Sequence, residues 1–222
     1  MNEEISGNEA MHLTKSRLES LSDGIFAFAM TLLVIGLSLP DKSSITLSNQ
    51  FASNLLVSLY SAFFHYVLAF LILGAFWLAH HIQIHPIHSL NRIYVWLNLS
   101  TLMFVALLPF STSFSGIFAG VPLGAMVFEA NLFAIGMGMF FQWRYATGRN
   151  RLVEPGMDHR FVRHVSIRSL IVPAISLLGI GVALTGNTYS TAVYLLIPGV
   201  ELTVSFLEER EAKATRAAAK IY

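Results

Sequence analysis

The side chains most able to do chemistry in this sequence lie inside or beside long apolar runs. Asp23 opens one of these runs, since no charged residue lies between Gly24 and Leu39. A carboxylate costs about 2.5–3.5 kcal/mol at the centre of a membrane helix and less near its end. Two interpretations are open. Ser22 or Asp23 caps a helix N-terminus, or the Asp23 carboxylate accepts hydrogen bonds from other helices and sets the rotation of its own.

Four histidines form a second cluster, with the spacing HHxxxHxxH: His80, His81, His85 and His88. This spacing could indicate a membrane di-iron centre, but such centres need further His or carboxylate ligands on other loops. Pro86 also interrupts the helix, so the four need not share one face. An interfacial polar cluster is the preferred interpretation, and we predict no metal site and no cofactor.

Three more titratable side chains fall inside apolar runs, namely His65, Glu129 and Glu201. Each could mark an ion path or be a structural residue within a helix bundle. The sequence contains no GxSxG, HExxH, Walker or dinucleotide-binding motif and no carbonyl-filter motif. We predict that the protein is not an enzyme. The alternatives are a secondary transporter coupled through Glu129 or His65 and, less favoured, a metalloenzyme that uses the His cluster.

The amino-acid composition indicates the kind of helices that must hold these residues in place. Of the 222 residues, 55% are hydrophobic and 12% are charged, against about 25% charged in soluble domains. A membrane-spanning helix needs about 20 mostly apolar residues. The sequence therefore predicts an all-α, polytopic membrane protein with no cleaved signal peptide. Six spans are expected, at about 21–39, 55–79, 94–114, 122–143, 167–184 and 190–207.

The basic residues predict the orientation of these spans. All of the 14 Lys and Arg residues except Lys42 fall on one side of the expected membrane, which identifies that side as the cytosol. Both termini should therefore be cytosolic in a multi-pass protein of a prokaryotic inner or plasma membrane. Residues 1–207 should form a single transmembrane domain, and residues 208–222 a short cytosolic tail. The formal net charge of +1 gives no reason to expect a nucleic-acid partner.

The first span carries an apolar stripe at positions i, i+4, i+7 and i+11, formed by Phe28, Leu32, Ile35 and Leu39. Thr31 and Ser38 lie just beside it. Such a stripe usually faces lipid or a protein core. Alternatively, several copies of the helix surround an axis, and their stripes form stacked hydrophobic rings that gate a pore by dewetting.

Several motifs together resemble the prokaryotic branch of the transmembrane protein 175 family of potassium channels. The family's RxxxFSD signature reads here as Arg17-Leu-Glu-Ser-Leu21-Ser22-Asp23, with Leu21 in place of the usual Phe. Downstream, Phe76-Trp77-Leu-Ala-His80-His81, Leu97-Asn98-Leu99 and Leu107-Leu-Pro109-Phe110-Ser-Thr112 resemble the family's second and third helices. The resemblance covers roughly residues 15–115.

The resemblance implies a homotetramer in a lipid bilayer that conducts K⁺ and other monovalent cations, with a modest preference for K⁺ over Na⁺. The first helix of each subunit would line the pore. Phe28, Leu32 and Ile35 would form the constriction, with Thr31 beside it and Phe28 where the family usually has an aliphatic residue. The resemblance also implies a polar network around this helix, made by Arg17, Ser22, Asp23, Trp77, His80, His81 and Asn98.

Overall fold

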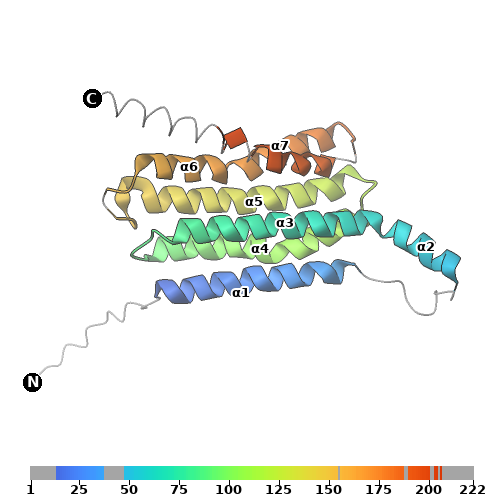
Figure 1. The fold of residues 1–222 in the computed structure, drawn as a ribbon, viewed down its shortest axis with the longest axis horizontal. Coiled ribbons are helices and arrows are strands. Elements are labelled where there is room, and N and C mark those ends of the chain that lie inside the picture. Colours follow the sequence, from blue (N-terminus) through green and yellow to red (C-terminus); the bar gives the residue numbers. More distant parts are fainter. Residues whose placement is uncertain are drawn as a thin grey trace, which may run out of the picture.

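The computed structural model describes residues 14–37, 48–154, 156–187 and 190–200, together with Thr203, Val204 and Phe206. The prediction of an all-α protein is confirmed: the described residues form a bundle of helices, with only an isolated bridge between Ile87 and Val153 (Figure 1). The helices are α1 (Lys15–Leu33), α2 (Asn49–Ser58), α3 (Tyr60–Ile84), α4 (Arg92–Ile117), α5 (Pro122–Thr147), α6 (His159–Ser169) and α7 (Ile171–Leu184). Short 3₁₀ turns cover Val34–Gly36, Gly148–Asn150 and Ser190–Leu196.

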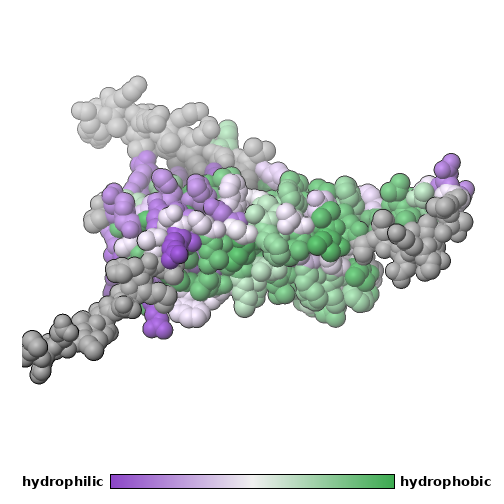
Figure 2. Space-filling view, turned by 90° about the horizontal axis from the view of Figure 1, so that it is seen from below, coloured by the Kyte–Doolittle hydropathy of each residue, from purple (hydrophilic) through white to green (hydrophobic). Residues whose placement is uncertain are grey.

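Five of these stretches are long and apolar enough to cross a membrane. They are Lys15–Gly36, Tyr60–Ile84, Arg92–Ile117, Pro122–Asn150 and His159–Leu184. At most half of each apolar window is buried inside the molecule. Figure 2, seen from the side where α1 lies in Figure 1, accordingly shows a hydrophobic surface over the middle of the bundle and hydrophilic residues gathered at one end. Apolar surface of this extent needs lipid or another subunit to cover it.

The observed ends of the helices differ from the expected ones where polar residues continue a helix past its apolar run. α1 begins six residues before the expected start, because the Thr14 side chain accepts a hydrogen bond from the Arg17 N–H and caps the helix there. The expected fifth span is the second half of a longer stretch in which the helix is interrupted at Leu170, between α6 and α7. Pro173 explains the interruption, because it has no N–H to bond the Ser169 carbonyl.

The expected sixth span, 190–207, lies partly outside the described residues. Its first part is a shorter apolar helix, Ser190–Val200. Its buried side chains include Tyr194, whose hydroxyl donates a hydrogen bond to Ser176 of α7 at 2.9 Å. Leu39, Glu201 and the tail 208–222 lie outside the described residues.

The helices pack through a shared apolar core in which α4 contacts α1, α3 and α5, while α5 contacts α7. α1 therefore lies at one edge of the bundle, and α6 and α7 lie at the opposite edge (Figure 1). Close helix approach depends on glycine at Gly136 in α5, where a Cβ atom would lie 2.6 Å from the Pro173 ring of α7. Contacts between carbons are unfavourable at that distance.

Replacing Gly136 with alanine should therefore destabilise the bundle. The overpacking penalty, about 1–3 kcal/mol, exceeds the gain of up to about 1 kcal/mol from alanine's higher helix propensity. We expect the melting temperature in detergent, followed by tryptophan fluorescence, to fall by several degrees. Gly181→Ala on α7 is the matched control, because a Cβ atom there meets nothing within 4 Å. Equal melting temperatures for the two variants would contradict the packing account.

Candidate functional site: a polar network behind an open face of the first helix

Three buried side chains join α1, α3 and α4 through one chain of hydrogen bonds. Asn98 of α4 donates from Nδ2 to the Ser22 hydroxyl of α1 at 3.1 Å, and its Oδ1 lies 2.9 Å from Nε2 of His80 in α3. The Ser22 hydroxyl itself donates to the Leu18 carbonyl at 2.9 Å. The Ser22 oxygen can therefore only accept from Asn98, so Oδ1 faces His80, which must carry its proton on Nε2. Ser22 and Asn98 are fully buried, and His80 is nearly so.

Asp23 contacts a different neighbour, although it follows Ser22 directly. Its Oδ1 accepts a hydrogen bond from Nε1 of Trp77 in α3 at 2.8 Å. The His81 ring lies beside Trp77, with ring centroids 6.3 Å apart and planes inclined by 31°. Successive residues of a helix point about 100° apart, so Ser22 faces the core while Asp23 lies on the exposed flank. The interpretation of Ser22 or Asp23 as the helix cap is wrong, because Thr14 caps α1.

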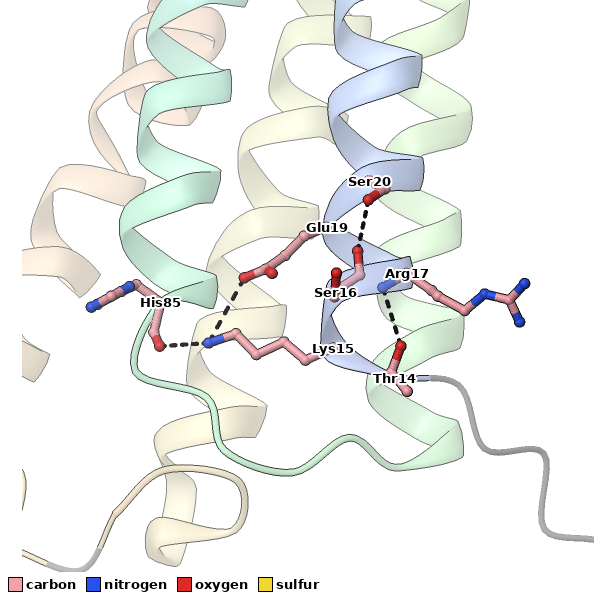
Figure 3. A network of polar contacts seen from close by, with 7 residues as sticks. All are labelled: Thr14, Lys15, Ser16, Arg17, Glu19, Ser20 and His85. Carbon is pink, nitrogen blue, oxygen red and sulfur yellow. Dashed lines mark hydrogen bonds and ion pairs between the residues drawn. The ribbon is translucent and has the colours of Figure 1, made fainter.

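Arg17 stands apart from this network. Figure 3 shows its guanidinium pointing away from the neighbouring helices, and in the described part of the chain it bonds no acceptor. Lys15 makes the contact between helices instead: Nζ donates to the carbonyl of His85 at 2.7 Å and lies 3.8 Å from a Glu19 carboxylate oxygen (Figure 3). The sequence reasoning missed Lys15, although its i, i+4 spacing to Glu19 is a recognisable helix ion pair.

The opposite face of α1, continued by the 3₁₀ turn Val34–Gly36, is not covered by other described helices. Phe28 is 65% exposed and Ile35 is 67% exposed, whereas Leu32 is half-buried. Thr31 is exposed, and its hydroxyl donates to the Phe28 carbonyl at 2.8 Å. The buried face consists of Leu18, Ser22, Phe26, Ala29 and Leu33. α1 is therefore anchored along one side by packing and the polar network, and it presents an apolar surface with one hydroxyl on the other.

The clustered histidines do not converge. His80 points into the core, His81 lies against Trp77, and His85 is exposed. Nε2 of His88 lies 3.2 Å from a carboxylate oxygen of Glu154, in the loop after α5. Across the ranges that the structure describes, no three His or acidic side chains are grouped so that they could hold a metal ion. The geometry therefore lends the metalloenzyme alternative no support.

The two described candidates for a coupled transporter occupy separate places. Nδ1 of His65 lies 2.7 Å from the Ser61 carbonyl, and its ring contacts Phe128 edge-on. Glu129 is fully buried, and its carboxyl group has the Ser190 hydroxyl as a polar neighbour. Its carboxyl group lies directly over Gly179 of α7, where a Cβ atom would be 2.7 Å from Oε1. His65 thus contacts its own helix α3 and α5, whereas Glu129 packs against α7.

Comparison with known proteins shows which family this chain resembles. The model of a family described as the endosomal/lysosomal potassium channel TMEM175 matches residues 17–109. A Chryseobacterium protein (strain P1-3) named as a potassium channel is 26% identical over 202 residues, which cover 88% of this chain and 100% of that protein. Residues 17–109 therefore carry the pattern of the TMEM175 family. The family resemblance expected from the motifs is confirmed.

Similarity to TMEM175 proteins extends beyond the matched stretch. The crystal structure of a lysosomal potassium-selective channel TMEM175 homolog from Chamaesiphon minutus superposes with a TM-score of 0.72 at 19% identity, covering 87% of this chain and 97% of that one. The mouse endosomal/lysosomal proton channel TMEM175 is 26% identical over 206 residues, which are 83% of this chain but only 39% of the mouse protein. The fold is thus that of TMEM175, and the chain is a multi-pass membrane protein.

Proposed function

We propose that this protein is a potassium-permeable cation channel of the bacterial plasma membrane and not an enzyme. Its pore is lined by α1 from each subunit of a homotetramer. Phe28, Leu32, Ile35 and Leu39 form stacked hydrophobic rings in place of a carbonyl filter, and Thr31 supplies a hydroxyl between them. Potassium is the permeant ion, and no cofactor takes part. Relatives named as potassium channels support the permeant ion.

The observation that carries the pore assignment is the two-sided character of α1. One side is fastened to α3 and α4 by the bond from Asn98 to Ser22 and the bond from Trp77 to Asp23. The other side is apolar and uncovered, with Phe28 and Ile35 about two-thirds exposed. A helix at the edge of a bundle can face lipid without hydrogen bonds that fix its rotation. A pore-lining helix needs a fixed rotation about its own axis, because that rotation decides which side chains meet at the symmetry axis.

The membrane topology belongs to the same proposal. Residues 1–207 form one six-helix channel domain with a sixth span at 190–207, and residues 208–222 form a cytosolic tail. The start of α1, the end of α3 and the loop after α5 meet at one end of the bundle, through the Lys15–His85 and His88–Glu154 contacts. The arginines between α5 and α7 also lie near this end, which supports a cytosolic location for it.

Reconstitution tests the function directly. Purified protein in liposomes with a K⁺ gradient should show passive, voltage-driven K⁺ flux, with smaller Na⁺ flux under matched conditions. The same vesicles loaded with a pH-sensitive dye measure proton flux, since the mouse relative is named as a proton channel. Flux that requires a proton or sodium gradient in strict stoichiometry would reject the channel in favour of a secondary transporter.

Substitution of the two described coupling candidates separates these classes further. Glu129→Gln keeps the size of the buried side chain, and His65→Ala removes the imidazole, so neither should change passive K⁺ flux by more than about twofold if the pore runs along α1. Flux should be measured per assembled particle after size-exclusion chromatography. Abolished flux in well-assembled Glu129→Gln particles would instead place the ion path through α5 and α7.

A further inference from the structure

Two arginines on α6 lie away from the proposed pore helix α1. Arg160 and Arg163 are both exposed and lie about one helical turn apart on the same side of α6. They point outward because the other side of the helix packs on α5: Val165 is buried, and the carbonyl of Val162 accepts a hydrogen bond from Nε1 of Trp143 at 3.1 Å. Their guanidinium groups therefore face away from the bundle.

Neither arginine is neutralised by a carboxylate among the described residues. The acidic groups on the loop before α6 are used elsewhere: Glu154 pairs with His88 at 3.2 Å, and Asp158 accepts the Arg160 backbone N–H at 2.9 Å as the helix cap. Arg144, Arg149 and Arg151 lie on the preceding segment and are also exposed, with Arg151 stacked 5.0 Å above the Tyr145 ring. Within the described ranges, this end of the α5–α7 pair therefore carries an excess of positive charge.

The position of the two arginines relative to apolar surface is specific. α6 continues almost in line into α7 (Figure 1), and the next exposed side chains along this line are Ile167 and Leu170, followed by Leu177 and Leu178. At 1.5 Å per residue, Arg163 lies about 6 Å before Ile167. The arginines thus stand where exposed hydrocarbon surface ends. They also lie on the edge of the bundle opposite α1, which faces lipid in any assembly that gathers α1 at its centre.

We propose that Arg160 and Arg163 bind the phosphate of an anionic phospholipid whose acyl chains lie along Ile167, Leu170 and the exposed leucines of α7. Guanidinium groups suit this role, because their planar donors pair with phosphate oxygens two at a time. Basic residues next to a membrane helix each strengthen binding to anionic lipid by about fivefold. The proposal depends on membrane insertion but not on conduction, so its test is independent of the ion flux.

The test measures lipid binding to the full-length protein by native mass spectrometry in detergent, with phosphatidylglycerol and phosphatidylcholine as probes. Arg160→Gln combined with Arg163→Gln should weaken phosphatidylglycerol binding by about 10- to 25-fold and leave phosphatidylcholine binding unchanged. The matched control is Arg92→Gln, an exposed arginine at the same end of the bundle on α4. It should change either affinity by less than twofold. Arg160→Lys with Arg163→Lys keeps the charge but loses the paired donors, so its affinity should fall between those of the wild type and the glutamine variant.

Three results would overturn the proposal. Unchanged phosphatidylglycerol affinity in the double glutamine variant would show that the charges only orient the protein. An equal loss of phosphatidylglycerol affinity in Arg92→Gln would show that the lipid responds to the overall positive charge of this end and not to a defined site. Displacement of the lipid by millimolar inorganic phosphate would show that the surface binds free phosphate and does not recognise a lipid.

Discussion

Asn98→Leu is expected to be the most destabilising substitution in the polar network. The leucine side chain has a similar size but takes away both the acceptor of the His80 Nε2–H and the donor to the Ser22 oxygen, and both partners are buried. An unpaired buried polar group costs about 1–3 kcal/mol in soluble proteins, while bonds between membrane helices average about 0.6 kcal/mol. A total loss of roughly 1–3 kcal/mol corresponds to a fall in melting temperature of about 3–10 °C.

The measurement is thermal unfolding in detergent, combined with size-exclusion chromatography to follow assembly. Because α1 is held in its rotation partly by this bond, we expect Asn98→Leu to reduce the assembled fraction as well as the melting temperature. Asn54→Leu on α2 is the control. Asn54 is exposed, so its replacement removes an amide without leaving a buried polar group unpaired. A fully assembled Asn98→Leu protein with wild-type stability would show that the network does not orient α1.

Ile35→Asn should have the largest effect on conduction. Ile35, in the 3₁₀ turn that continues α1, is the most exposed residue of the described apolar stripe, at 67%. Four copies of it would meet around the pore axis in the proposed tetramer. A hydrophobic ring holds back ions because water leaves it, and an amide in each subunit would keep it wet. We expect passive K⁺ flux in liposomes to rise roughly threefold to tenfold, with a smaller preference for K⁺ over Na⁺.

The control for this prediction is a polar substitution on another exposed apolar surface. Leu71 on α3 is 64% exposed, so Leu71→Asn makes the same chemical change away from α1. Its flux per assembled particle should match that of the wild type. If Ile35→Asn leaves flux and ion preference unaltered in assembled protein, then the open face of α1 does not line the ion path.

The apolar runs and the placement of basic residues determine much of the architecture without any tertiary information. Backbone groups in lipid must be hydrogen-bonded internally, so a run of about 20 apolar residues has to be a helix. This reasoning predicted the helical class and the approximate position of the five described spans. It missed the early start of α1, because the Thr14 cap acts through a single hydrogen bond that hydropathy does not detect.

The motifs around Asp23, Trp77 and Asn98 identified the candidate residues of the polar network, and the match to the TMEM175 family model lies in the same stretch of sequence. Only the tertiary structure decided which of them touch. Ser22 and Asp23 are adjacent in sequence, yet one bonds Asn98 inside the bundle and the other bonds Trp77 on its flank. Likewise Lys15, and not Arg17, reaches the end of α3. The physical reason is that sequence spacing defines the faces of one helix, whereas contacts also depend on how neighbouring helices are rotated and displaced, which is set by the packing of the whole bundle.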